Sequence, residues 1–427
     1  MISNKTTKDY TLWKLFPLVV FIFNPKIDII SIPNFWQGIR LDDIIVMFYS
    51  ILFFVSNKFK IYPNLINSKI FGYNWIIFFP YMVFAIVLGK SFGISPQLLI
   101  VIRYCEYIAL IIILNQLDPP KDKILLLFKI YILLNFIIVM LQYFEILGGL
   151  TSRGTVCTVH VPGCLDKEDI KSICFLNCDL GFMKNLVHPG DFLNKRVPGI
   201  TGGPWELSMN LSMCIYGIAL FEKKLKRLIP YILLVVVMML IGQSRGIVFG
   251  FLAGSLFLIN DYKKAIKLFI MLFILITFIY FFNFFNFKEI ADNKFLIDYF
   301  ALIKIVIGSF TGNLPSESAL VGTGLESMFV RATTWSEIFS DLRKSSVLLF
   351  FGSGGGDFIY TESFIVRVLS SFGLIGSFII LYMSRKLPLF FISFILVSGI
   401  TIDVFVSFKI FVFSCLLLMM CKKKENI

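Results

Sequence analysis

The sequence has few charged residues for its length, and this scarcity excludes most water-soluble folds. Of its 427 residues, 16% are charged and 57% are hydrophobic, whereas soluble domains carry about a quarter charged residues. Apolar runs of about 20 residues, each long enough to cross roughly 30 Å of hydrocarbon, recur along the chain, as at residues 265–285. We therefore expect a bilayer to be the solvent for most of the chain.

A signal-peptide cleavage site is also lacking. The first apolar run follows Lys5, Lys8 and Lys14 but does not lead into a small-residue cleavage site, so we expect a retained first helix. The basic excess, 40 Lys and Arg against 27 Asp and Glu, occurs in short clusters between apolar runs. That placement is typical of cytoplasmic loops facing anionic membrane lipids and argues against nucleic acid as a partner.

The apolar pattern predicts an all-α polytopic membrane protein, with residues 1–427 forming a single membrane domain. Basic clusters at residues 57–60, 121–123, 223–227, 263–267, 385–386 and 422–424 all fall on the side of the N-terminus, so both termini should be cytoplasmic. We predict about twelve membrane-spanning helices, at residues 12–31, 39–56, 72–90, 96–116, 123–145, 204–221, 228–243, 245–260, 264–285, 362–383, 386–402 and 403–421.

This topology leaves two long outer loops, at residues 147–203 and 286–361, and long loops on a packed scaffold often carry function. Within the second loop, apolar residues recur at intervals of three and four, which predicts an amphipathic helix lying along the membrane surface. Arg331 and Trp335, one turn apart, share a flank of it. Its apolar face comprises Leu325, Met328, Phe329, Ala332, Trp335, Phe339 and Leu342.

The eight cysteines form two groups. Four lie in predicted spans, where we expect small apolar packing residues, and four lie in the first outer loop. An even number in an oxidising compartment indicates two disulfides, with three possible pairings. Zinc is the alternative, because the only histidines of the chain, His160 and His188, share this loop, but the spacings match no zinc pattern well. The loop cysteines are Cys157, Cys164, Cys174 and Cys178.

Three polar stretches stand out at the predicted outer face. The first is Arg196–Glu206 (RVPGITGGPWE), where the chain re-enters the membrane. The second is Gly242–Gly246 (GQSRG), a tight turn between two spans. The third joins Arg331 and Trp335 to the glycine-rich run at Gly352–Asp357 and the polar pair Glu362 and Ser363.

In this order, these stretches resemble the O-antigen polymerase (Wzy) and O-antigen ligase (WaaL) superfamily over most of the chain after Arg196. The resemblance implies a glycosyltransferase C-like membrane fold in the bacterial cytoplasmic (inner) membrane. It further implies transfer of glycans from undecaprenyl diphosphate at the periplasmic face, with no cofactor or required metal. Undecaprenyl-diphosphate-linked glycans and membrane lipids are then the expected partners, and a chain-length regulator is a further candidate.

Arginines are the candidate ligands of the lipid diphosphate. Planar guanidinium groups at headgroup level can hold its oxygens in bidentate fashion while negative charge develops. We predict this role for Arg196, Arg245 and Arg331. The alternative is that arginines near helix ends extend to lipid phosphates without a part in chemistry.

Carboxylates are the candidate bases for deprotonating the attacking sugar hydroxyl. Glu362 and Glu206 lie where the outer loops meet the membrane, although Glu362 could instead stabilise a helix start. Asp357 and Trp335 are secondary candidates. Arg367, about one turn after Glu362, is another. The glycine-rich run could bind phosphate or act as a hinge, but it lacks the Lys-Ser/Thr ending of a nucleotide loop.

We therefore expect polymerisation of lipid-linked repeat units into O-antigen or a related surface polysaccharide. An O-antigen ligase is the alternative enzyme, and the lack of histidine outside the first loop argues against it. A polysaccharide flippase is the alternative from another class; against it, no internal repeat is visible.

Overall fold

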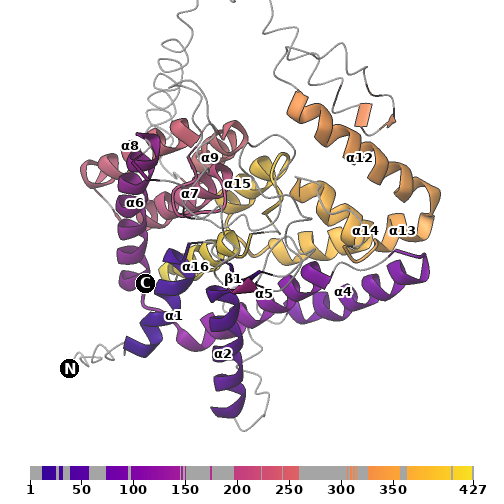
Figure 1. Ribbon diagram of the computed structural model, residues 1–427, viewed down its shortest axis with the longest axis horizontal. Coiled ribbons are helices and arrows are strands. Elements are labelled where there is room, and N and C mark those ends of the chain that lie inside the picture. Colours follow the sequence, from indigo (N-terminus) through magenta and orange to yellow (C-terminus); the bar gives the residue numbers. More distant parts are fainter. Residues whose placement is uncertain are drawn as a thin grey trace, which may run out of the picture. The chain divides into compact units, whose positions relative to one another are not determined.

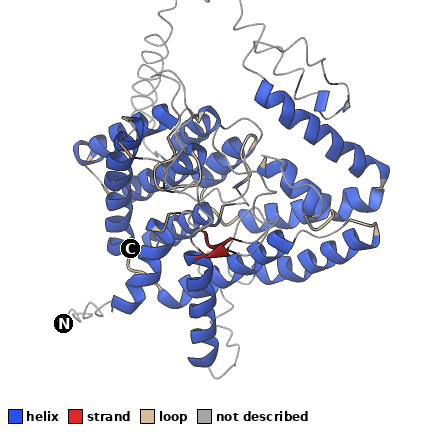
Figure 2. Ribbon diagram, viewed as in Figure 1, coloured by secondary structure: helices blue, strands red, loops and turns tan. Residues whose placement is uncertain are grey.

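The computed structural model describes residues 12–25, 28–31, 39–56, 74–94, 98–144, 146–147, 150, 174–175, 197–222, 224–242, 244–258, 305, 308–309, 311–312, 314, 326–355, 363–404 and 407–425. These residues form thirteen helices and three short strands (Figures 1 and 2). The chain divides into two compact units, and the single membrane domain expected from the sequence stays a prediction. Unit 1 comprises Met1–Gly72, Tyr104–Phe251 and Ser407–Ile427, and unit 2 comprises Tyr73–Arg103 and Leu252–Val406.

Unit 1 is built around α7 (Pro204–Phe221), whose residues from Glu206 to Ile218 are all buried. Its serines can be buried because Ser208 and Ser212 each donate a hydrogen bond to the carbonyl four residues earlier. Helices α6, α8 and α16 pack against α7. The helices of unit 1 are α1 (Leu12–Phe23), α2 (Leu41–Ser56), α6 (Lys121–Tyr143), α7, α8 (Leu225–Gly242) and α16 (Phe408–Glu425), with parts of α5 (Leu98–Leu117) and α9 (Arg245–Leu258).

A small antiparallel sheet joins the first predicted outer loop to the connection between α1 and α2. Its order is β2 (Ile39–Arg40), β1 (Asp28–Ser31) and β3 (Cys174–Phe175). The first predicted span, residues 12–31, was therefore too long. Helix α1 ends at Phe23, and the residues at 28–31 pair as a strand instead.

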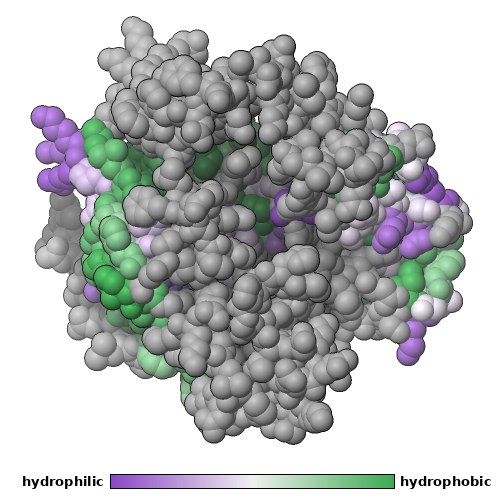
Figure 3. Space-filling view, turned by 45° about the horizontal axis from the view of Figure 1, so that its top comes forward, coloured by the Kyte–Doolittle hydropathy of each residue, from purple (hydrophilic) through white to green (hydrophobic). Residues whose placement is uncertain are grey.

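Helix α6 is apolar on both its buried and its exposed face. One face packs inside unit 1 through Leu127, Phe128 and Tyr131. The opposite face exposes large aliphatic side chains at helical spacing, which is unfavourable in water and suited to lipid. On the side where α6 and α8 lie in Figure 1, Figure 3 shows a strip of apolar surface next to a hydrophilic patch. The exposed residues of α6 are Leu126, Ile130, Leu133, Leu134 and Ile137.

Among the described helices, α6 and α14 (Phe364–Ser384) are the two that are long and apolar enough to cross a membrane, by length and composition. Helix α14 also exposes large apolar residues in its second half, at Ile375, Phe378 and Leu381. These features are compatible with an all-α membrane protein. Twelve spans and the orientation of the termini remain predictions.

Unit 2 contains α4 (Asn74–Ser91), α12 (Glu326–Lys344), α13 (Ser346–Phe351), α14 and α15 (Leu389–Gly399). Helix α14 packs against α4, α12, α13 and α15. The helix predicted around Arg331 is present as α12, whose apolar face forms a core cluster with residues of α13 and α14; its position along a membrane surface stays a prediction. The buried members of the cluster are Ile305, Ala332, Trp335, Ile338, Phe339, Leu342, Leu348 and Val366.

The helix directions in unit 1 agree with the alternation of the predicted spans. Contacts bring the last residues of α1, α6 and α8 together with the turn and first residues of α7 and α16. The topology assigns all of these ends to the outer side of the membrane. We call this end of unit 1 the outer end. Its location on the outer side of the membrane is a prediction from the topology.

Candidate site at the outer end of unit 1

A buried turn leads into α7 at the outer end. The Pro198 carbonyl accepts the Thr201 amide at 3.1 Å and lies 2.7 Å from the Thr201 hydroxyl. Gly199 has φ +60, and a Cβ there would fall 2.5 Å from Oδ1 of Asn135, so a larger residue would both strain the backbone and clash. Val197, Ile200 and Thr201 are almost fully buried. The turn therefore needs partners inside the protein for its backbone polar groups.

Two amide side chains of α6 supply part of these partners. Nε2 of Gln142 donates to the Gly199 carbonyl at 3.0 Å, and Oε1 of Gln142 accepts the Gly199 amide at 2.8 Å. Asn135, seven residues earlier on the same face, accepts the Ile200 amide at 3.1 Å. Both side chains are fully buried. Neither amide was predicted as a site residue, although two amides seven residues apart in a largely apolar span were a usable signal.

Glu206 holds the same turn from the first turn of α7. Its Oε2 accepts the Gly202 amide at 2.7 Å, and its Oε1 accepts the hydroxyl of Ser407, which immediately precedes α16. The carboxylate is fully buried. Glu206 was predicted as a candidate base, but both oxygens accept hydrogen bonds within unit 1. This geometry favours a structural role for Glu206, near the positive end of the helix dipole.

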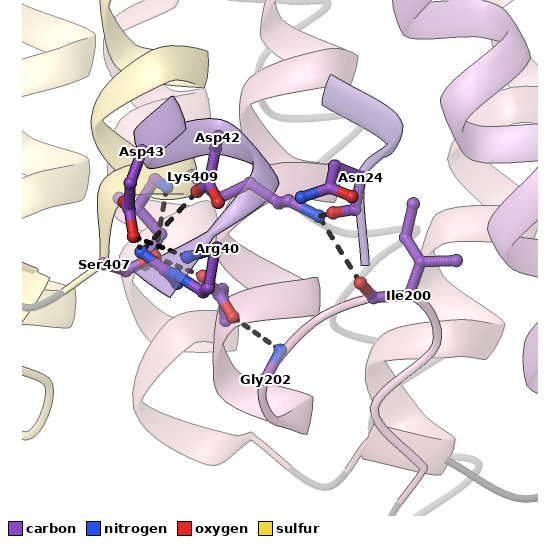
Figure 4. Close-up of polar contacts among 10 residues, drawn as sticks. Asn24, Arg40, Asp42, Asp43, Ile200, Gly202, Ser407 and Lys409 are labelled. Carbon is purple, nitrogen blue, oxygen red and sulfur yellow. Dashed lines mark hydrogen bonds and ion pairs between the residues drawn. The ribbon is translucent and has the colours of Figure 1, made fainter. Parts of the chain in front are cut away.

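Lys409 and Arg40 add buried positive charge beside the turn (Figure 4). Nζ of Lys409 donates to the Asn24 carbonyl at 2.6 Å and lies 3.4 Å from the Ile200 carbonyl. The Arg40 amide donates to Asp43 at 2.9 Å, and its guanidinium lies 3.5 Å from Asp43 and 3.6 Å from Asp42. Buried charges of both signs therefore lie together at the outer end. This pairing lowers the free-energy cost of burying them.

The second predicted stretch reaches the same end of unit 1. A Cβ on Gly242, the last residue of α8, would lie 3.5 Å from Pro204 Cβ and from Ser208 Oγ in the first turn of α7. Helix α9 begins three residues later, at Arg245, and the Ser244 carbonyl accepts its first amides. Gly242, three residues before Arg245, thus packs against the start of α7.

In unit 2, the start of α14 is tied to the segment that follows α15. Ser363 caps α14 by accepting the Val366 amide at 3.4 Å, and its hydroxyl donates to the Gly399 carbonyl at 3.1 Å. Nε of Arg367 donates to Oδ2 of Asp403 at 2.8 Å, and both side chains are buried. Arg367 was a secondary candidate for the site, and the structure gives it Asp403 as a partner, which the sequence did not predict.

The glycine-rich run packs against a break in α14. Gly373, with φ 61 and ψ −168, interrupts the helix, so the carbonyls of residues 370–372 lose their usual helical donors. Other groups replace these donors: the amides of Ser353 and Gly354 donate to the first two carbonyls at 2.9 and 2.7 Å, and the Tyr81 hydroxyl donates to the third at 2.6 Å.

The described part of this run is closely packed against its neighbours. A Cβ on Gly354 would lie 2.4 Å from the Cα of Ile86 in α4. The amide of Gly352 is also bonded, to Leu348 at 2.7 Å. The described residues of the run tie α13, α14 and α4 together. Phosphate binding and hinge motion, the two alternatives for the run, stay untested because Gly356 and Asp357 lie outside the described residues.

The remaining predicted residues fall into two groups. In α12 of unit 2, Trp335 is buried in the core cluster and Arg331 is half-buried on the flank. The others are wholly or partly undescribed: Arg196, Asp357, Glu362, Cys157, Cys164 and Cys178 lie outside the described residues, as do the side chains of Arg245 and Cys174. His160 and His188 also lie outside them. The described residues contain no cluster of three or more His, Cys, Asp or Glu that could hold a metal ion.

Comparisons with known proteins add no relative to this picture: the chain matches no family model, and no curated protein or solved structure matches it.

Proposed function

We propose that this protein is an integral membrane glycosyltransferase that polymerises undecaprenyl-diphosphate-linked repeat units into O-antigen or a related surface polysaccharide at the periplasmic face of the cytoplasmic membrane. The observation that carries the proposal is the meeting of two motif segments at the outer end of unit 1. The Gly242–Gly246 turn contacts the helix start that follows Arg196, through Gly242 against Pro204 and Ser208. In the resemblance, these segments supply two of the diphosphate-binding arginines.

The membrane setting is supported by α6, which links that end to the lipid phase. Its 23 residues, at 1.5 Å rise each, would span about 34 Å, slightly more than a hydrocarbon core of roughly 30 Å. The exposed face is aliphatic, while the two amides on the buried face serve the turn at residues 197–202. A helix whose few polar side chains point inward and whose outward face is apolar is the arrangement that lipid favours.

The proposed reaction transfers the growing glycan from one lipid to another. A hydroxyl at the end of one lipid-linked repeat attacks the anomeric carbon of a second glycan. A carbon–oxygen bond forms there, and the bond to the diphosphate oxygen breaks. The hydroxyl proton goes to a base, and undecaprenyl diphosphate leaves with the bonding electrons. Negative charge therefore develops on the diphosphate, where fixed guanidinium groups stabilise the transition state most effectively.

Within this proposal, Arg196, Arg245 and Arg331 bind the diphosphate and Glu362 is the base. Asp357 stays a secondary candidate. Glu206 is set aside as a base because its two oxygens hold Gly202 and Ser407.

The experiment that tests the function is deletion of the gene, followed by gel analysis of lipopolysaccharide. We expect lipid A cores that bear at most one repeat unit, because flippase and ligase encoded elsewhere still act. Complete loss of O-antigen would favour a ligase or flippase instead, and unchanged long ladders would contradict all three functions. Re-expression of the wild-type chain should restore the ladder.

A further inference from the structure

Lys129 is a positive charge within the membrane-length helix α6 that the proposed function does not use. It lies eight residues after the first residue of α6, about 12 Å along the helix axis, in a stretch at residues 124–134 that is otherwise hydrophobic. Its side chain is half-buried. A charge at such a depth is costly in lipid unless it has a partner. Lys129 therefore needs an anionic partner.

The described residues give this charge an aromatic ring and no carboxylate. Nζ of Lys129 lies 5.8 Å from the centre of the Tyr231 ring in α8, a contact that offsets only part of the cost of a desolvated charge. No carboxylate among the described residues pairs with Lys129, and Asp122, the acidic residue of α6, lies two turns away. Within the same part of the chain, the Tyr231 hydroxyl has no hydrogen-bond partner. An ammonium and a hydroxyl are thus left for a ligand.

An apolar strip begins directly beside Lys129. Leu126 and Leu133, three residues before it and four after it, share its side of α6, and they are 50% and 46% exposed. Helix α8, which packs against α6, exposes Leu233 and Val237. On the side where these helices lie, Figure 3 shows apolar surface next to a hydrophilic patch. The surface therefore combines a cation with an area that suits a hydrocarbon chain.

We propose that Lys129 and Tyr231 form a binding site for one anionic phospholipid. Its phosphate accepts from the Lys129 ammonium and the Tyr231 hydroxyl, and one acyl chain lies along the apolar strip. Side chains on a helix point back toward its first residue, so the ammonium lies nearer the headgroups than the Cα of Lys129 does. Tyrosine is itself typical of the membrane–water interface. The inference goes beyond the proposed polymerase and uses only its membrane setting.

The charge of the headgroup distinguishes this site from ordinary lipid contact. A zwitterionic headgroup carries its own cation, which competes with Lys129 for the phosphate, whereas an anionic headgroup has a net negative charge to offer. Each lysine near a membrane surface strengthens the attraction to anionic lipid by a factor on the order of five. Lys121 and Lys123, in the first turn of the same helix, add positive charge toward the headgroups.

The test is photo-crosslinking of the full-length protein in liposomes that contain phosphatidylcholine and phosphatidylglycerol in equal amounts. A trace of either lipid, with a photoreactive group in the same acyl chain, is the probe, and mass spectrometry locates the adducts. We expect the phosphatidylglycerol probe to label the peptides at residues 124–137 and 228–240 on the order of fivefold more than the phosphatidylcholine probe. Labelling requires no polymerising activity, so its outcome is independent of the proposed function.

Variants of Lys129 connect this preference to one side chain. Lys129→Leu, which suits a lipid-facing position, and Lys129→Gln should each reduce phosphatidylglycerol labelling to the phosphatidylcholine level. Lys129→Arg keeps the charge and should keep the preference. Lys386→Leu is the matched control, because Lys386 is exposed between α14 and α15 of unit 2 and the topology assigns it to the same side of the membrane. Its loss should leave the labelling of α6 and α8 unchanged.

Three results would overturn the site. Equal labelling of these peptides by the two probes in the wild type would mean that any boundary lipid occupies the surface. A preference that survives both Lys129→Leu and Lys129→Gln would mean that Lys129 does not hold the phosphate. A preference lost to the same extent in Lys386→Leu would mean that general surface charge attracts the lipid.

Discussion

Arg367 and Asp403 form a buried ion pair in unit 2, with Nε of Arg367 2.8 Å from Oδ2 of Asp403 and side chains 3% and 8% exposed. The pair joins the first turn of α14 to the segment that follows α15. A second bond, from the Phe364 amide to the Ile402 carbonyl at 2.9 Å, runs beside it. The first turn of α14 is thus attached at two points to the segment that follows α15.

Removing one partner of this pair should destabilise the protein more than removing both. Asp403→Leu or Arg367→Met alone leaves a buried charge without its counterion and should cost about 3 to 5 kcal/mol, whereas an apolar replacement of the whole pair is often near neutral. Thermal unfolding of the purified protein in detergent measures this. Single variants as stable as the wild type would show that the pair is not buried as described.

The joint between the glycine-rich run and α14 should be sensitive to one added methyl group. Gly354→Ala combines left-handed strain of about 1 to 2 kcal/mol with a clash against Ile86 that should add about 1 to 3 kcal/mol. Gly93→Ala is the control, because Gly93 has φ +79 and no atom within 4 Å of the added Cβ. Equal shifts in unfolding temperature for the two variants would mean that the close approach is absent.

The arginines offer a test that separates diphosphate binding from extension toward lipid headgroups. Arg196→Lys, Arg245→Lys and Arg331→Lys keep the charge but lose the planar fork, so each should shorten the polymer. One lost charge-assisted contact should cost about 2 to 4 kcal/mol of transition-state stabilisation, or roughly 30- to 1000-fold in rate.

The control for this series is Arg227→Lys, because Arg227 is 67% exposed at the start of α8, a helix end that the topology assigns to the cytoplasm. It should leave the ladder unchanged at equal protein amounts in the membrane. Normal ladders from all three test variants would remove the arginines from the mechanism.

The cysteines of the first loop should be oxidised in the mature protein, because the loop faces a compartment that favours disulfides. Thiol labelling after denaturation without reductant should then modify Cys105, Cys214, Cys415 and Cys421, which are free thiols in the structure. It should spare the four cysteines of the loop. Labelling of all eight only after a chelator is added would support zinc instead.

The helices were predictable because apolar runs and charge clusters depend on local sequence. The span predicted at residues 204–221 matches α7 residue for residue, and most other described helices agree within a few residues. The end of α1 was missed because Ile29 and Ile30 continue the apolar run, and hydropathy cannot separate a strand from a helix there.

The partners of the polar residues could not be predicted, since they come from distant parts of the chain. Lys409 could not be placed from sequence because its acceptors are backbone carbonyls at Asn24 and Ile200. Glu206 was predicted as a candidate base for the same reason: its partner Ser407 lies 201 residues away. Local spacing identifies which polar residues lie near a membrane boundary, and only the fold shows which of them are already engaged.

Reconstitution tests the central claim most directly. The purified protein is placed in liposomes with a synthetic undecaprenyl-diphosphate-linked repeat unit as both donor and acceptor, without nucleotide sugar. Glu362→Gln, which keeps the size of the side chain but removes its basic carboxylate, serves as the inactive reference. We predict a ladder of lengthened lipid-linked glycans and released undecaprenyl diphosphate from the wild type only. A folded wild-type protein that leaves the repeat unit unchanged would contradict the account.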